Sequence, residues 1–124
     1  MTGSTEARVR ATVHAGQHLL TPTGRARFEI GDIDRGGIVL LFGAGRWRTP
    51  VPWELLEEAV RSLSGRGWVL VGAQHRTDSA PGSLESIVKP ALRRSAANYI
   101  AALLEYAGVC ELDRRPPMRV RLCL

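Results

Sequence analysis

The sequence predicts a single α+β domain over residues 1–124, in which a small antiparallel sheet packs on one helix. Three observations carry this prediction. An alternating segment at 27–30 precedes a glycine-bounded apolar run at 37–42, residues 53–63 repeat apolar side chains at helical spacing, and 83–124 read as two helical segments and a hairpin. Because a helix, a turn, a longer helix and a β-hairpin form the element order of a winged helix-turn-helix, we expect the C-terminal half to take that form.

The N-terminal part is expected to be an irregular arm followed by strands. Residues 1–7 are small and polar without periodicity, and residues 8–14 alternate basic or polar with small apolar side chains. Such an alternation is typical of a strand with one face in water. Residues 27–30 and 37–42 predict an antiparallel pair at the centre of the sheet, because the segment between them is rich in the glycine and aspartate that tight turns require.

The middle of the chain predicts a loop, a helix and a strand. Residues 43–52 contain two glycines, which permit positive φ, and two prolines, which are excluded from a central strand. Apolar residues at helical spacing, with glutamates between them, predict a helix over 53–63. Residues 68–71 form an apolar run typical of a buried strand. We expect Trp53 and Trp68 in the core because both lie in strongly patterned segments.

The C-terminal part predicts two helices and a hairpin. Ser83 is a suitable N-cap for a short helix, and Pro90 is expected to limit or kink that helix after about two turns. Ser95 is expected to cap a second helix over 96–107, which glycine terminates. Residues 109–122 contain two strand-like segments separated by a turn with two prolines, which predicts a terminal hairpin.

The charge of the chain favours a polyanionic partner. Seventeen basic and twelve acidic residues give a net charge of +5, with a pI near 10.2. The sequence has neither an apolar run long enough to span a bilayer nor the pattern of a signal peptide. Cys110 and Cys123 are too few for a disulfide scaffold. We therefore expect a cytoplasmic protein without membrane contact, associated with the nucleoid when bound to DNA.

Basic residues concentrate toward the carboxyl end and mark a candidate DNA-binding site. From Lys89 onward the chain has seven basic and three acidic residues, which supplies +4 of the net charge. One group lies at the start of the second predicted helix, where the helix dipole favours phosphate, and the other lies at the predicted tip of the hairpin. The candidate DNA-binding residues in these groups are Arg93, Arg94, Ser95, Asn98, Arg114 and Arg115.

The tripeptide Arg46-Trp47-Arg48 is a second candidate site. An aromatic ring between two guanidinium groups, on a loop bounded by glycine and proline, has the chemistry to contact a base while the arginines bind phosphate or guanine. The alternative is that Trp47 folds back onto the sheet and the two arginines flank it in water.

Residues 28–122 resemble a bacterial winged-helix-like DNA-binding module associated with modification-dependent restriction, a group that includes actinobacterial proteins that bind 5-methylcytosine DNA. The resemblance rests on RTPVPWELL at 48–56, GSLE at 82–85 and SAANYIAALL at 95–104. It implies a protein that reads modified DNA without its own nuclease. Reading a 5-methyl group requires an apolar or aromatic surface beside the base, with an arginine on the adjoining guanine, and the tripeptide around Trp47 is suited to this.

No catalytic or cofactor motif stands out. His14 and His18 lie on either side of a glycine, and His75 and Asp78 have no identifiable nucleophile near them, so we expect no metal, no cofactor and no enzymatic activity. The predicted function is binding to double-stranded DNA, selective for 5-methylcytosine, and palindromic targets would favour a homodimer. Two rivals stay open: a protein-interaction or transcription-regulatory module that uses the 96–107 helix as its interface, and a small hydrolase.

Overall fold

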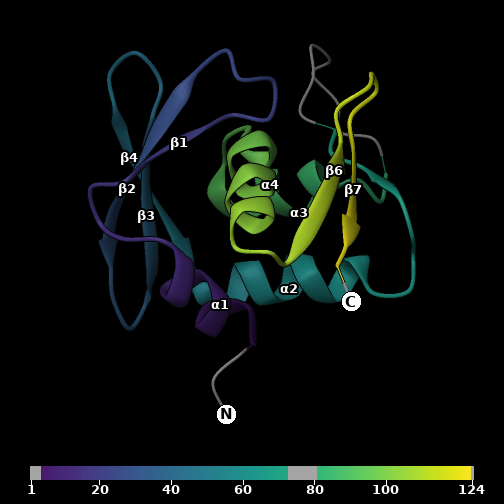
Figure 1. Ribbon diagram of the computed structural model, residues 1–124, viewed down its shortest axis with the longest axis horizontal. Coiled ribbons are helices and arrows are strands. Elements are labelled where there is room, and N and C mark those ends of the chain that lie inside the picture. Colours follow the sequence, from purple (N-terminus) through teal and green to yellow (C-terminus); the bar gives the residue numbers. More distant parts are fainter. Residues whose placement is uncertain (1–3, 73–80, 124) are drawn as a thin grey trace.

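A computed structural model describes residues 4–72 and 81–123, and two antiparallel sheets lie on either side of a central helix (Figure 1). The elements are α1 (Ser4–Thr12), β1 (His18–Leu20), β2 (Arg27–Ile33), β3 (Gly37–Phe42), β4 (Trp47–Pro52), α2 (Trp53–Leu63), β5 (Val69–Leu70), α3 (Leu84–Leu92), α4 (Ala97–Tyr106), β6 (Cys110–Asp113) and β7 (Arg119–Leu122). Helices α1 and α2 close one end of the molecule (Figure 1). The α+β prediction is confirmed. None of the helices in the described ranges combines the length and apolar character that a bilayer span requires.

The first sheet has the order β1-β2-β3-β4, and its neighbouring strands are antiparallel. The predicted pairing of 27–30 with 37–42 is confirmed, with Ile30 opposite Leu40 and both side chains fully buried. The turn between the two strands is held by Asp34, whose carboxylate accepts hydrogen bonds from the amides of Gly36 (2.8 Å) and Gly37 (3.1 Å). A short polar side chain that binds the backbone two residues on is the reason aspartate favours such turns.

The prediction of a loop over 43–52 is wrong beyond residue 46, because β4 occupies residues 47–52 at the edge of the sheet. The amide of Trp53, directly after β4, donates to the carbonyl of Gly36, directly before β3, and so points to the β3 side. Strand amides alternate in direction, so Pro50 and Pro52 direct their missing N–H groups away from β3. Prolines are excluded from central strands but are tolerated at an edge in this orientation.

Helix α1 begins at Ser4, so the predictions of an irregular arm over 1–7 and a strand over 8–14 are wrong in the described part of the chain. Thr5, Val9 and Val13 are all buried, at the spacing of four that places residues on one helical face. The same valines also alternate with polar residues, and this alternation suggested a strand.

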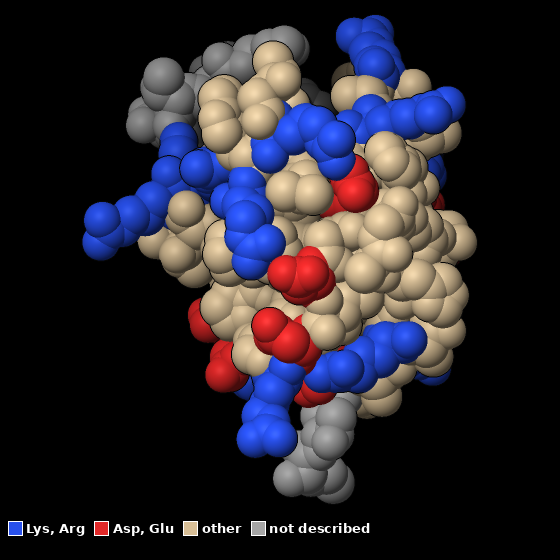
Figure 2. All heavy atoms as spheres, turned by 90° about the vertical axis from the view of Figure 1, so that its left-hand side faces the viewer, with Lys and Arg blue, Asp and Glu red and all other residues tan. Residues whose placement is uncertain are grey.

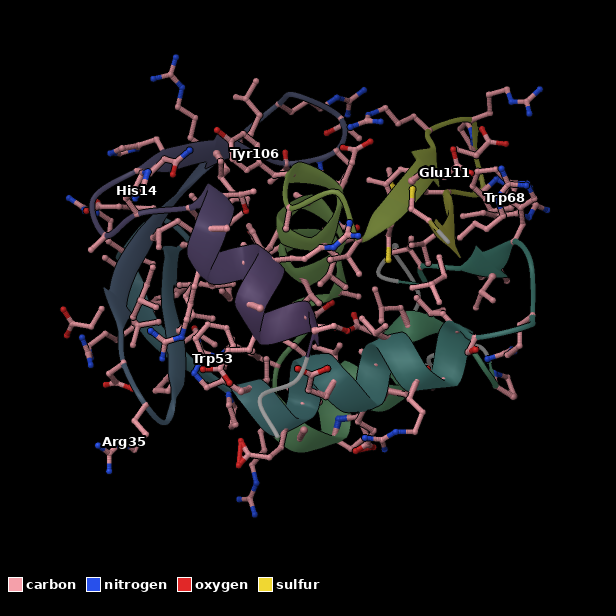
Figure 3. All side chains as sticks on the ribbon, turned by 60° about the horizontal axis from the view of Figure 1, so that its bottom comes forward. His14, Arg35, Trp53, Trp68, Tyr106 and Glu111 are labelled. Atoms are coloured by element: carbon pink, nitrogen blue, oxygen red, sulfur yellow. The ribbon has the colours of Figure 1, made fainter. Side chains whose placement is uncertain are left out.

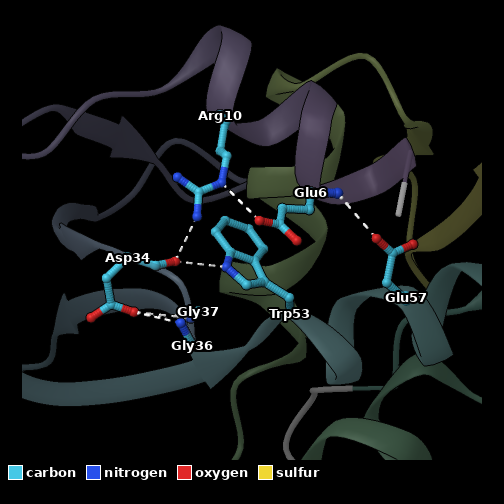
Figure 4. Close-up of polar contacts among 7 residues, drawn as sticks. All are labelled: Glu6, Arg10, Asp34, Gly36, Gly37, Trp53 and Glu57. Atoms are coloured by element: carbon cyan, nitrogen blue, oxygen red, sulfur yellow. Dashed lines mark hydrogen bonds and ion pairs between the residues drawn. The ribbon is translucent and has the colours of Figure 1, made fainter. Parts of the chain in front are cut away.

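Polar contacts attach α1 to α2 and to the β2–β3 turn (Figure 4). The Glu6 amide donates to the carboxylate of Glu57 (3.2 Å), and the Arg10 guanidinium donates to the carbonyl of Asp34 (2.7 Å). That carbonyl also accepts the indole N–H of Trp53 (2.8 Å), over which Arg10 lies at 5.1 Å. These contacts supply the hydrogen bond that a buried tryptophan needs.

Helix α2 spans the predicted residues 53–63, and Trp53 is 4% exposed, as expected for a core residue. The second sheet has the order β5-β7-β6 and contains the predicted terminal hairpin of β6 and β7. Trp68, however, is 41% exposed, so its assignment to the core is wrong. Trp68 precedes β5 and lies at the surface of the molecule (Figure 3). The guanidinium of Arg121 lies 4.4 Å from the centre of its ring. This cation–π contact explains how the indole is accommodated at the surface.

The predicted pair of helices is present, with two differences at the helix ends. Ser83 caps α3 as expected, accepting the amide of Ser86 at 3.2 Å, but α3 continues past Pro90 to Leu92. A proline so close to the end of a helix removes one backbone hydrogen bond and leaves the last turn intact. Ser95 does not cap α4. Its hydroxyl donates instead to the carboxylate of Glu85.

Helix α4 is enclosed between the two sheets (Figure 1). Most of its side chains are buried, and its partners are β1 on one side and β6 on the other. The buried residues are Ala97, Ile100, Ala101, Ala102, Leu103 and Leu104. A recognition helix must offer one face to a DNA groove, and α4 has little surface to offer. The winged-helix arrangement predicted for residues 83–124 is therefore not confirmed.

Candidate nucleic-acid interface

The turn between β3 and β4 presents Trp47 at the surface. The Arg46 amide donates to the carbonyl of Gly43 (3.0 Å), and Gly43 has φ +86°. A Cβ added at Gly43 or Gly45 would lie 2.8 or 2.9 Å from the nearest indole atom, so the ring lies directly against both glycines. Trp47 is nevertheless 59% exposed. Of the two alternatives for this tryptophan, the structure shows the exposed one, with a ring supported by its own turn.

Strand register places Trp47 beside an aromatic pair. Trp47 lies opposite Phe42 in the β3–β4 ladder, so both side chains emerge on the sheet face that covers α4. The ring of Phe42 stacks on Tyr99 of α4, with 3.9 Å between centroids and 15° between planes. Phe28 meets the same tyrosine edge to face at 5.3 Å. The aromatic surface next to Trp47 is therefore anchored in the core.

The junction between α3 and α4 brings two arginines to this surface. Arg93 adopts the left-handed conformation, with φ 58°, where α3 ends. The Arg94 guanidinium donates to the hydroxyl of the buried Thr49 (3.1 Å) and lies 6.0 Å from the ring of Phe42. Together these residues surround an open cavity of about 480 Å³. Its lining consists of Phe42, Gly43, Trp47, Arg93, Arg94, Ser95 and Tyr99. We call this site the Trp47 cleft.

A buried carboxylate fixes the junction. Glu85 is 2% exposed, and it accepts hydrogen bonds from the Ser95 hydroxyl and from the amides of Ala96 and Ala97, both at 3.3 Å. These amides are at the start of α4, where unpaired N–H groups and the helix dipole favour a negative charge. Glu85 thus joins α3 to α4 and holds the backbone that carries Arg93 and Arg94.

The two arginines that flank Trp47 in sequence point elsewhere. Arg48 lies opposite Leu41, on the outer face of the sheet, and its guanidinium is 3.4 Å from Asp32. Arg46 forms an ion pair with Glu29, also on the outer face. Figure 2 shows this side of the molecule, where basic side chains lie over the upper part and again near the bottom, with carboxylates between them. The expected grouping of Arg46 and Arg48 around the indole is not what the structure shows.

The C-terminal arginines predicted to contact DNA are paired with carboxylates. Arg114 forms a two-pronged ion pair with Glu105 and donates to the carbonyl of Pro22 (2.7 Å), instead of extending from a hairpin tip. Arg115 pairs with Asp113 at 2.8 Å, and this hydrogen-bonded guanidinium lowers the pKa of Asp113 to about 2. The pKa of each of these two guanidinium groups is raised by its hydrogen bond to the carboxylate.

By contrast, neither Arg93 nor Arg94 forms an ion pair with a carboxylate of residues 4–72 or 81–123. Arg93, Arg94 and Ser95, which were predicted near the start of α4, thus line the Trp47 cleft. Asn98, predicted with them, is half-buried on α4 and does not line the cleft. Two lining residues, Phe42 and Tyr99, were missed, as was Thr49, which holds Arg94. Alternation along 37–42 and 47–52 would have placed Phe42 and Thr49 on one face.

The sites of the alternative functions give no second candidate among the described residues. The 96–107 helix, proposed as a protein interface, has its apolar stripe buried within the fold. The segment Gln74 to Asp78, which contains His75, lies outside the described residues. In the ranges that are described, no three His, Cys, Asp or Glu side chains are grouped in a way that could hold a metal ion.

Comparison of the chain with protein-family models, with curated proteins and with solved structures finds no match to any of them.

Proposed function

We propose that the protein binds double-stranded DNA, selectively where it carries 5-methylcytosine, and that it does so without catalysis. One observation carries the proposal: the Trp47 cleft joins a supported, exposed indole to two arginines that have no carboxylate partner among the described residues. A guanidinium without a counter-charge attracts phosphate or the acceptor edge of guanine.

The chemistry of each side chain in the cleft indicates which part of the DNA it would contact. Arg94 is already held by Thr49 and Phe42, so it loses little side-chain freedom when it binds a ligand. Arg93 is exposed and reaches phosphate as a second cation. The indole of Trp47 supplies the apolar surface that a 5-methyl group requires. Arg46 and Arg48 add positive potential from the outer face, reduced by their acidic neighbours.

A salt titration tests DNA binding. The affinity for a duplex should fall steeply with salt, with a log–log slope of about 0.9 for each phosphate contacted. The double variant Arg93→Ala/Arg94→Ala should therefore bind more weakly and show a shallower slope. Arg115→Ala is the matched control, because Arg115 is exposed but paired with Asp113, and its slope should equal that of the wild type. Binding that ignores salt would contradict the proposal.

A second comparison tests the methyl preference. Two duplexes that differ only in the 5-methyl group of one cytosine should bind with different affinities, and Trp47→Ala should remove the difference. Trp68→Ala is the control, since Trp68 is also exposed but lies next to β5, beside the three-stranded sheet and away from the Trp47 cleft (Figure 3). Equal affinities of the wild type for the two duplexes would leave DNA binding without modification selectivity.

A further inference from the structure

The Trp47 cleft presents the faces of aromatic rings. The indole of Trp47 lies against Gly43 and Gly45 and leaves most of its surface in solvent, and the stacked Phe42 and Tyr99 form the neighbouring wall. An exposed aromatic face recognises a flat partner by stacking, and every nucleobase has such a face.

A paired duplex offers no base face to this surface until one of its bases leaves the stack. In double-stranded DNA the faces of the bases are covered by their neighbours, and the grooves display only the edges. A base that stacks on a protein ring has to leave the duplex stack, or must already be unpaired. The stacking surface therefore favours DNA that offers an unstacked nucleotide.

The dimensions and charges of the cleft fit one nucleotide. Its volume of about 480 Å³ is within the range of about 300–1,000 Å³ that small-ligand sites occupy. Arg93 and Arg94 come from the α3–α4 junction on one side, and Trp47 comes from the β3–β4 turn on the other. A base that stacks on Trp47 would have its phosphate within the positive field of the two arginines.

We propose that the Trp47 cleft binds a single unstacked nucleobase, with its phosphate on Arg93 and Arg94, and that the favoured ligand is DNA containing an unpaired nucleotide. This inference rests on the proposed function, since it names the form of DNA that the same site takes.

The test compares two DNAs of the same sequence, one fully paired and one with a single-nucleotide bulge. A paired duplex must unstack a base before it can fill the cleft, and the bulged duplex has little of that cost. We expect the bulged duplex to bind at least about tenfold more tightly, since unstacking costs a few kcal/mol. Equal affinities of the wild-type protein for the two DNAs would overturn the inference.

Variants at Trp47 separate stacking from apolar contact. Trp47→Phe retains an aromatic face and should keep part of the preference for the bulged duplex. Trp47→Leu keeps apolar surface without a ring and should lose that preference while still binding paired DNA. Trp68→Ala should behave as the wild type. A Trp47→Leu variant that kept the full preference would also overturn the inference.

The two proposals fail in different ways. If the wild type shows no salt-dependent binding to any DNA, the proposed function itself is wrong. If it binds both DNAs in a salt-dependent manner but with equal affinity, DNA binding stands and the stacking site is refuted. Thermal unfolding of each variant checks that it is folded, which we expect because Trp47 is exposed.

Discussion

Replacing Arg93 by glycine should weaken DNA binding without destabilising the fold. Arg93 has φ 58° and ψ 30°, a left-handed conformation that costs an L-residue about 1–2 kcal/mol and costs glycine almost nothing. Glycine also gains freedom in the unfolded chain, which costs about 0.5–1 kcal/mol. The difference predicts that Arg93→Gly has a free energy of unfolding about 0–1.5 kcal/mol above that of Arg93→Ala, which keeps the strained backbone.

The comparison with Arg93→Ala isolates the backbone, because both variants remove the same charge from the end of α3. Urea unfolding followed by circular dichroism gives the two free energies, and a titration with duplex DNA gives the two affinities. Both variants should bind DNA more weakly than the wild type and to a similar extent. The reasoning is refuted if Arg93→Gly is clearly less stable than Arg93→Ala, or if either variant binds DNA as the wild type does.

Three further predictions concern the groups around the cleft and the hairpin. Glu85→Ala should lower the free energy of unfolding by about 2–3 kcal/mol, because it leaves buried donors at the start of α4 without an acceptor. Glu58 is exposed, so Glu58→Ala should change that free energy by no more than about 0.5 kcal/mol, and urea unfolding measures both variants. Arg114→Ala should lower the free energy of unfolding by about 1 kcal/mol or less and leave the affinity for DNA unchanged. Weaker DNA binding by this variant would show that Arg114 contributes to the DNA interface. Burial raises the pKa of Cys110 from 9.0 to about 12. Iodoacetamide at pH 8 should therefore label only the exposed Cys123 in the native protein and both thiols in urea, as measured by mass spectrometry. Labelling of both cysteines in the native protein would contradict this prediction. Since the folded state binds the Cys110 proton more tightly than the unfolded state, this thiol should lower stability as the pH rises above about 9 and have no effect below it.

The parts of the fold that sequence reasoning predicted are those set by local periodicity. The β2–β3 hairpin was predicted from the alternation at 27–30, the glycine-bounded apolar run at 37–42 and the turn residues between them, and α2 was predicted from the helical spacing over 53–63. Helix α1 was missed because valines four residues apart also fit a strand when polar residues lie between them. Strand β4 was missed because its two prolines are compatible with a strand only at an edge, and the edge position depends on the whole sheet.

The candidate site was predicted in pieces. Trp47, Arg93 and Arg94 were each identified from their chemistry, but no local pattern indicated that residues so far apart in the chain would line one cavity. The opposite directions of Trp47 and Arg48 could not be recognised while their segment was taken as a loop. The pairing of Arg114 with Glu105 depends on how the terminal hairpin packs beside α4, which is a tertiary contact.

The prolines of β4 also determine how this sheet meets other molecules. An extended peptide that aligned along the outer rim of β4 would find no amide donor at Pro50 or Pro52, so it could not complete a regular ladder there. Growth of the sheet by addition of a foreign strand is thus blocked along the half of β4 that lies farther from the β3–β4 turn, whereas the Trp47 end of the strand is left to partners that bind through rings and charges.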